Sequence, residues 1–175
     1  HMVLNSLACI IVCIYLGVNT QDIQRLFSSF KNAARRFSLK TFGDIVTIDD
    51  YAHHPTEIKV TLEAARAKYP DKKLIAVFKP NTYSRTAAFT KEFADSLKIA
   101  DKVFMTEIDC NREKQEDYPG ITSSLVLKDI PDGEIIGEDD VDKLLKYQNA
   151  VICFMSCASI SHIKDKYESL LESTK

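Results

Sequence analysis

The sequence has no tryptophan and no basic block, and its 23 lysines and arginines nearly balance its 25 aspartates and glutamates. A nucleic-acid-binding arm or a polybasic membrane patch needs clustered Lys and Arg, so neither nucleic acid nor a membrane is an expected partner. With five glycines and five prolines the chain has no low-complexity tract. It does have 45% hydrophobic residues, which is enough for the core of one ordinary domain.

Cysteine is scarce and odd in number, with Cys9, Cys13, Cys110, Cys153 and Cys157 lying mostly in apolar runs. This pattern is typical of reduced thiols in a cytoplasmic protein rather than of a disulfide framework. The two close pairs, Cys9/Cys13 and Cys153/Cys157, have no second tight Cys/His pair to complete four zinc ligands. We therefore expect no structural metal site, a buried structural thiol at Cys157, and an exposed Cys110 without chemistry.

A membrane-spanning run of about 20 apolar residues is also absent. The most apolar stretch, VLNSLACIIVCIYLGV at residues 3–18, is shorter, contains Asn5 and lacks a basic start. It predicts a buried helix, and a helix that is apolar all round needs cover on most sides. Either another subunit covers residues 3–16, through self-association, or the chain is a fragment whose usual cover is missing. His1-Met2 fits a cloning remnant.

Two helices are expected at residues 3–16 and about 20–31, with Gly17 ending the first and Thr20 capping the second. The stretch that follows, KNAARRFSLKTFGD, is basic and then extended, so it resembles a connector, in which Arg35-Arg36 form a solvated hinge. We place a domain boundary there, between residues 1–41 and residues 42–175.

Beyond this boundary, apolar runs of strand length alternate with segments of helical period. The runs lie at 44–49, 74–78, 102–107, about 134–136 and 150–155. The helical stripes are Ile58, Leu62, Ala65 and Tyr69; Phe89, Phe93 and Leu97; and Ile160, Ile163, Tyr167, Leu170 and Leu171. Strict alternation predicts an α/β fold, with a Rossmann-like, mainly parallel sheet and helices on both faces.

Polar clusters follow four of these runs: DDYAHHP, KPNTYSRT, EIDCNREK and SCAS. Open α/β sheets bind ligands beyond the carboxyl ends of their strands, so the sequence predicts a site at this edge. In SCAS the small residues either admit an anion to helix N–H groups or allow close helix–sheet packing.

The first cluster, IDDYAHHPTE, has two interpretations. Pro55 and Glu57 suit a helix start without any ligand. Capping does not account for Asp50, Tyr51 and His53, and a carboxylate such as Asp50 can accept hydrogen bonds from both hydroxyls of a ribose. On the residues alone, a polar helix start and a binding site stay equally open.

The second cluster favours function. Lys79, Asn81, Ser84 and Arg85 follow a strand and precede a helix. An arginine near a helix start is unfavourable unless an anion is bound there, because the helix start is already positive. Arg85 therefore predicts a carboxylate or phosphate ligand.

The stretches IDDYAHHPTEIKVTLEAAR, LIAVFKPNTYSRT and FADSLKIADKVFMTEI together resemble the carboxyl-terminal domain of the Mur ligases of bacterial peptidoglycan synthesis. Within that family, DDYAHHPTE followed by P-x-T-[FY]-[ST]-R-T resembles the members that join L-alanine to UDP-N-acetylmuramate. Residues 3–18 and FKNAARRF resemble the last helices of the family's central ATPase domain and the hinge after it. The resemblance covers nearly the whole chain.

The resemblance implies an ATP-dependent ligase that forms an acyl phosphate and then an amide, with ATP and Mg²⁺ held mainly by parts of the family absent from this chain. It implies no catalytic residue and no metal ligand here. The implied ATP-side residues are Asn5 near adenine, Arg36 at the hinge, Asp50 on the ribose, and His53. The implied substrate-side residues are Tyr51, His53, Asn81 and Arg85.

What the sequence lacks relative to that family matters too. It has no Gly-Lys-Ser/Thr phosphate loop and no domain for the UDP-sugar, so we expect a cytoplasmic bacterial fragment that is inactive alone. Several residues depart from the family pattern: Met2, Asn32, Ala34, Lys79 and Asn81, and Ser156–Ser159 in place of a Gly-Ala-Gly-Asp turn. The departures at the cleft leave amino-acid specificity open. The alternatives are a muropeptide-recycling or other amide ligase, and a non-catalytic nucleotide-binding module.

Overall fold

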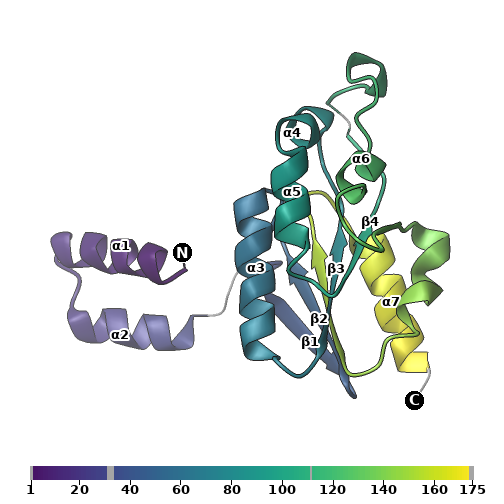
Figure 1. Ribbon diagram of the computed structural model, residues 1–175. Helices are drawn as coiled ribbons and strands as arrows, with labels where there is room; N and C mark the ends of the chain where they lie inside the picture. The colour runs from purple at the N-terminus through teal and green to yellow at the C-terminus, as the bar shows by residue number, and fades with distance from the viewer. Residues whose placement is uncertain (1, 31–33, 111, 174–175) are drawn as a thin grey trace. The chain divides into compact units, whose positions relative to one another are not determined.

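The computed structural model describes residues 2–30, 34–110 and 112–173 (Figure 1). The chain divides into two compact units, residues 1–33 and 34–175. The departure predicted at Asn32 lies outside the described residues.

The first unit is a pair of helices, α1 (Met2–Tyr15) and α2 (Thr20–Ser29), where the sequence predicted them. Gly17, at φ +79°, follows α1 and turns the chain, because glycine enters the left-handed region without steric cost. The predicted cap of α2 was wrong by one residue. Asn19 is the N-cap, and its side-chain oxygen accepts a hydrogen bond from the Gln21 N–H at 2.8 Å.

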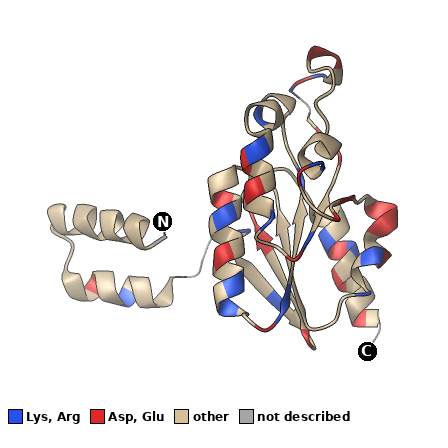
Figure 2. Cartoon of the chain, viewed as in Figure 1, with Lys and Arg blue, Asp and Glu red and all other residues tan. Residues whose placement is uncertain are grey.

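Helix α1 carries no Lys, Arg, Asp or Glu (Figure 2). Its apolar side chains are nevertheless exposed in this chain, among them Val3, Leu7 and Ile11. The prediction of a buried helix is therefore wrong for the chain as it stands, because one neighbouring helix covers only one side of a helix that is apolar all round. Within the described ranges, no helix is both long enough and apolar enough to cross a bilayer.

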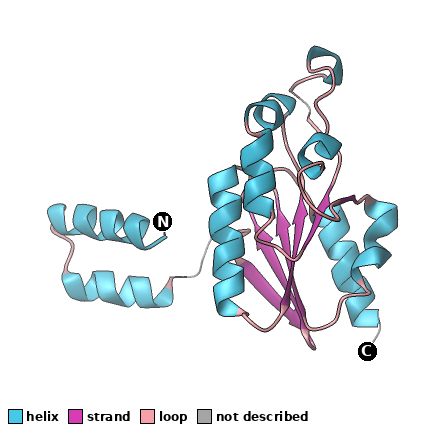
Figure 3. Ribbon diagram, viewed as in Figure 1, coloured by secondary structure: helices cyan, strands magenta, loops and turns pink. Residues whose placement is uncertain are grey.

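The second unit is built on a six-stranded sheet in the order β1-β2-β6-β3-β4-β5 (Figure 3). The strands are β1 (Ser38–Phe42), β2 (Ile45–Asp50), β3 (Lys73–Phe78), β4 (Lys102–Met105), β5 (Glu134–Ile135) and β6 (Ala150–Met155). All neighbouring pairs are parallel except β1 and β2. The predicted α/β fold with a mainly parallel sheet is confirmed.

Strand β1 is the element that the sequence did not reveal. It pairs antiparallel with β2, so residues 38–41, predicted to belong to the connector, are part of the sheet. Only Phe42 of its five residues is buried, and an edge strand with one buried side chain shows no apolar run. The assignment of the residues before it to another domain stays a prediction.

Helices cover both faces of the sheet. One face packs against α3 (Pro55–Lys68), α5 (Thr90–Leu97) and α6 (Ser123–Leu127), and the other against α7 (Ser161–Ser173) and the 3₁₀ segment η2 (Glu138–Leu144). Two short elements lie beyond the strand ends, α4 (Tyr83–Ala88) and the 3₁₀ turn η1 (Gln115–Asp117).

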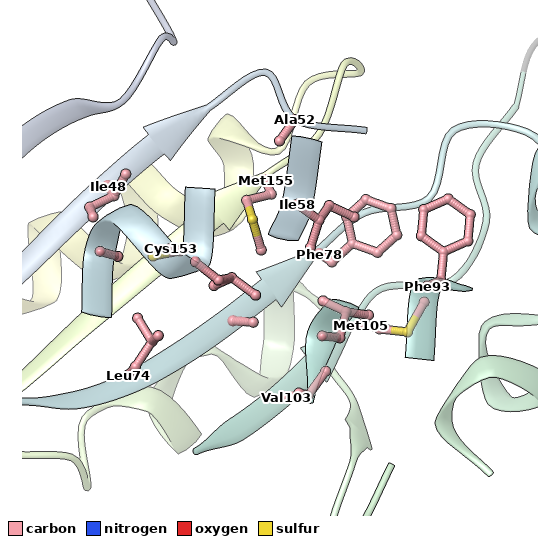
Figure 4. Close-up of a cluster of buried hydrophobic side chains, with 14 of the residues drawn as sticks. Ile48, Ala52, Ile58, Leu74, Phe78, Phe93, Val103, Met105, Cys153 and Met155 are labelled. Atoms are coloured by element: carbon pink, nitrogen blue, oxygen red, sulfur yellow. The ribbon is translucent and has the colours of Figure 1, made fainter. Parts of the chain in front are cut away.

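The core on the first face is a continuous apolar cluster, in which the rings of Phe78 and Phe93 lie 5.3 Å apart (Figure 4). The predicted stripe Ile58, Leu62 and Ala65 is fully buried there. Neighbouring strand residues alternate between the two faces, and every residue of β6 is buried. This rigid double-sided core fixes the strand ends from which the polar clusters emerge.

Candidate ligand-binding pocket

A hollow of about 820 Å³ lies at the carboxyl ends of the parallel strands, within the size range of small-molecule sites. It is lined by Tyr51, His53, Lys79, Asn81, Arg85, Asp109, Cys110, Arg112, Glu138, Cys157, Ala158, Ser159 and His162. All four predicted polar clusters contribute, so the predicted convergence at this edge is present. Of the predicted site residues, the pocket brings together Tyr51, His53, Asn81 and Arg85.

Asp50 ends β2 but does not line the pocket. Its carboxylate is nearly buried, and the two oxygens accept hydrogen bonds from the backbone N–H groups of Phe37 and Ala52, each at 2.8 Å. Burial raises the pKa of Asp50 above its ordinary value, against the N–H groups of Ala52 and Phe37, which lower it. Both carboxylate oxygens of Asp50 therefore stabilise the backbone around the end of β2. The ribose-binding role of Asp50 stays a prediction.

The helix-start interpretation of Pro55 and Glu57 is correct in detail. Pro55 is the first residue of α3, and His54 is its N-cap, accepting from the Thr56 N–H at 3.4 Å. The Glu57 carboxylate accepts from the N–H groups of His53 and His54, which completes a capping box. Burial raises the pKa of Glu57, but these bonds and the charge of His53 outweigh it and hold the pKa below its usual value.

Tyr51 and His53 form one wall of the pocket. Their rings meet edge to face with centroids 5.3 Å apart. The His53 Nδ1 lies 3.0 Å from the Tyr51 carbonyl oxygen and 3.1 Å from the Glu57 carboxylate, so the imidazole is oriented by protein contacts on one side. Its other nitrogen is left for a ligand or solvent.

Arg35 and Arg36 both lie near the Tyr51 ring, with guanidinium carbons 5.6 and 5.1 Å from its centroid. Arg36 is exposed and does not line the pocket. Arg35 is held by protein, because its guanidinium donates to the carbonyls of Ser156 and Ala158 and to the Asp49 carboxylate. The interpretation of Arg35 as a solvated hinge residue is therefore wrong.

Lys79 and Asn81 extend the pocket beyond β3. The Lys79 side chain is nearly buried and its ammonium lies 2.9 Å from the Asp109 carboxylate. The hydrogen bond and the charge of Lys79 hold the pKa of Asp109 below its usual range. Asn81 is half-buried and lines the pocket.

Arg85 also lines the pocket, near the start of α4. A carboxylate of the chain itself lies beside this helix start, since Glu113 accepts from the backbone N–H of Ser84 at 3.0 Å and from its hydroxyl. The ligand expected at Arg85 stays a prediction. The Ser84 hydroxyl and N–H, with a further contribution from Arg85, hold the pKa of Glu113 below its ordinary value. Even so, no described residue accepts a hydrogen bond from the Arg85 guanidinium.

The segment after β6 combines packing with pocket lining. Ser156 is fully buried, and its hydroxyl donates to the Lys79 carbonyl at 2.9 Å and accepts from the Ala158 N–H at 3.1 Å. This supports the close-packing alternative for SCAS at its first residue. Cys157, predicted to be a buried structural thiol, is only partly buried and lines the pocket, as does Cys110, predicted to be exposed. Tertiary contacts rather than local hydrophobicity set both exposures.

Among the lining residues that were not predicted as site residues are Asp109, Arg112, Glu138 and His162. Asp109 and Arg112 lie in the cluster after β4, so their position was a usable signal. Glu138 and His162 come from η2 and α7, and no sequence feature singled them out. Asn5 lies on α1, in the other unit, and is exposed.

No group of three or more His, Cys, Asp or Glu side chains in the described part of the chain is arranged to hold a metal ion. The pocket carries the cations Lys79, Arg85 and Arg112 and the carboxylates Asp109 and Glu138. Because Asp109 pairs with Lys79, the two arginines are the cations left to attract an anionic ligand.

Known proteins that are similar to this chain support the fold described above. The chain is 46% identical over 173 residues to a UDP-N-acetylmuramate–L-alanine ligase of Levilactobacillus brevis, a match that covers 98% of this chain and 38% of that relative. Its structure is similar to that of UDP-N-acetylmuramate-alanine ligase from Thermotoga maritima, at 26% identity and TM-score 0.78 over 100% of this chain and 38% of that one. A murein peptide ligase from Psychrobacter arcticus shares the fold at 24% identity and TM-score 0.71, over 95% of this chain and 36% of that one.

The chain thus spans 38% of the length of the Levilactobacillus brevis relative. Residues 35–156 match the family described as Mur ligase, glutamate ligase domain, and this range contains all six strands and the polar clusters that follow β2, β3 and β4. By this match and by its fold, the chain belongs to the Mur ligase family.

Proposed function

We propose that this chain is part of an ATP-dependent ligase that joins L-alanine to UDP-N-acetylmuramate in peptidoglycan synthesis, and that its pocket binds the amino acid and faces the nucleotide. Family membership and the 46% identity to the Levilactobacillus brevis ligase support the proposal. The observation that carries it is that Arg85 and Arg112 line the pocket while no described residue accepts a hydrogen bond from either guanidinium. Two such groups in a polar hollow favour an anionic ligand.

In the proposed reaction, the carboxylate of UDP-N-acetylmuramate takes the γ-phosphoryl group of ATP and ADP leaves. The amine of L-alanine then attacks the acyl carbon, inorganic phosphate leaves, and the amine gives up a proton. The anions to be held are the alanine carboxylate and the phosphate oxygens, which suit Arg85 and Arg112. Tyr51, His53 and Asn81 offer hydrogen bonds beside them. The pocket's proposed contribution is to bind and orient.

The nucleotide side is the second part of the proposal. Arg36 is exposed beside Tyr51 and is free to reach a phosphate. Asp50 is proposed for the ribose through lone pairs not used by Phe37 and Ala52, and Asn5 for the adenine. The residues of α1 and α2 are proposed to come from the central ATPase domain. Mg²⁺, which neutralises phosphate charge when bound, is assigned to the rest of the ligase, because the described residues offer no three-ligand group.

The test is amino-acid-dependent phosphate release by the full-length ligase and by this 175-residue chain. We expect turnover with L-alanine in the full-length enzyme and none in the chain alone. Arg85→Ala in the full-length enzyme is expected to lower kcat/KM for L-alanine by about a hundredfold. The control is Arg66→Ala, an arginine paired with Asp101 outside the pocket. Unchanged turnover in Arg85→Ala would refute the proposed role of the pocket.

The same assay separates the rival functions. Acceptance of a peptide in place of L-alanine would identify a muropeptide ligase, and nucleotide binding without turnover would identify a non-catalytic module. Self-association through the exposed apolar residues 3–16 stays a prediction, and a monomer by light scattering would contradict it.

A further inference from the structure

Residues 34–37, here called the lead-in segment, have an unusual backbone. Arg35 and Phe37 both adopt positive φ angles, +58° and +52°. For a residue with a Cβ the left-handed conformation costs about 1 kcal/mol or more, so it persists only where surrounding contacts hold it. Two such residues within three positions therefore require several tertiary contacts that hold the backbone of this segment in its conformation.

Two adjacent carboxylates provide part of those contacts. Asp50 accepts a hydrogen bond from the Phe37 N–H at 2.8 Å, and Asp49 accepts one from the Arg35 Nε at 3.3 Å. The Arg35 carbonyl accepts from the Tyr51 N–H at 2.8 Å. The lead-in segment is thereby bound along the end of β2.

The Arg35 guanidinium continues across to the neighbouring strand. One of its terminal nitrogens donates to the Ser156 carbonyl at 2.5 Å and to the Ala158 carbonyl at 3.0 Å. These carbonyls follow β6, the parallel neighbour of β2. Tyr51 and Ala158, on the two strands' outgoing loops, both line the pocket. One side chain therefore ties together two pocket walls and the segment that leads into the sheet.

We propose that Arg35 is a positioning residue for the pocket: its guanidinium holds the loops after β2 and β6 in register, so that the orientation of Tyr51 and Ala158 depends on the conformation of the lead-in segment. Arg35 does not itself line the pocket. Its effect on catalysis rests on the proposed function above, whereas its effect on the two loops does not.

The structure provides reporters and a matched control. The amides of Tyr51, Ser156 and Ala158 each donate a hydrogen bond, to Arg35, Asp50 and Ser156 respectively, so their hydrogen exchange reports the two loops. The control is Arg66, whose guanidinium donates in the same way to two carbonyls and one aspartate, those of Lys72, Ile99 and Asp101, at the opposite ends of the strands.

The main variant is Arg35→Gly, because it removes the whole side chain, guanidinium included, while glycine keeps the positive φ without strain. In this chain we expect exchange at the three reporter amides to accelerate about tenfold, from the loss of hydrogen bonds to a charged donor. Exchange in the central strands should stay at the wild-type rate, which shows that the variant is folded. Arg66→Ala should leave the reporters unchanged and accelerate exchange at Leu74 and Asp101, which bond to one another.

Arg35→Lys keeps the charge and loses the planar fork. We expect Arg35→Lys to accelerate exchange at the reporter amides as Arg35→Gly does. If Arg35→Gly does not fold, Arg35→Lys is measured in its place. In the full-length ligase, both variants should raise the KM for L-alanine about tenfold with a smaller change in kcat, a split that a general loss of folded protein does not produce.

Reporter exchange within about twofold of wild type in folded Arg35→Gly and Arg35→Lys would overturn the inference. So would an unchanged KM in a ligase that is active with L-alanine. If the full-length protein lacks ligase activity, the proposed function fails while the exchange measurement still decides the role of Arg35.

Discussion

The ammonium group of Lys79 lies 2.9 Å from the Asp109 carboxylate, with the lysine side chain 8% exposed and the aspartate side chain 68% exposed. The pair joins the end of β3 to the loop after β4 inside the pocket. A nearly buried ammonium is tolerated when a counter-ion pairs with it. Asp109 is therefore what allows a lysine side chain to be nearly buried at the end of β3.

This pair predicts a pH effect. Lys79 lowers the pKa of Asp109 from its ordinary value of 3.8, with a smaller contribution from His162. A carboxyl whose folded pKa is lowered stabilises the fold above its ordinary pKa, and that stabilisation is lost as pH falls through the lowered value. Lys79→Gln should return the Asp109 pKa toward the ordinary value, as measured by a carboxyl ¹³C NMR titration.

The matched control for that titration is Lys102→Gln, which removes the partner of Glu134 at the other end of β4. It should leave the Asp109 titration unchanged. An Asp109 pKa that is the same in wild type and in Lys79→Gln would show that the ion pair does not form in solution.

Asp50→Ala is expected to destabilise this chain in the absence of any nucleotide. The substitution leaves the N–H groups of Phe37 and Ala52 without their acceptors, a loss of about 1 to 3 kcal/mol in the free energy of unfolding. Urea denaturation measures it. Asp95→Ala, at an exposed position on α5, should stay within about 0.5 kcal/mol of wild type. Equal stabilities of the two variants would leave Asp50 without the structural role described above.

Glu57→Ala should lower the free energy of unfolding by about 1 kcal/mol, because it removes the carboxylate that caps the N–H groups of His53 and His54. The same denaturation experiment measures the change. Glu63, on the same helix, makes only a 3.9 Å exposed contact with Lys59, so Glu63→Ala serves as the control. A larger effect at Glu63 than at Glu57 would contradict the capping box.

The cysteines should differ in reactivity toward a thiol reagent. Cys153 is fully buried in β6, and burial raises the pKa of its thiol, so it should be modified only when the protein unfolds. Cys110 and Cys157 line the pocket and should be modified in the native state. Site-resolved mass spectrometry distinguishes them. Native-state modification of Cys153 ahead of Cys157 would be inconsistent with this packing.

Much of the fold is local information and was predictable. The local hydrophobic pattern predicts the strands β2, β3, β4, β5 and β6 from their apolar runs. It also predicts helix α3 from the buried stripe Ile58, Leu62 and Ala65. The capping of α3 by residues 54–57 is equally local, since its contacts span three or four positions. Strand β1 was missed because an edge strand with one buried residue carries no such pattern.

The partners of the charged residues were decided only by tertiary structure. Nothing near Arg35 in the sequence indicates that it donates to Ser156, 121 positions away, or that Asp49 and Asp50 hold the segment before β1. The anionic ligand expected at Arg85 stays a prediction, and the sequence did not indicate that the Glu113 carboxylate accepts from the Ser84 N–H beside it. By itself, the sequence determined which residues form the strands β2 to β6 and that their polar ends meet at one edge. Which charges meet there depended on the packing of distant loops, because hydrogen bonds and ion pairs act over a few ångströms in space, regardless of distance along the chain.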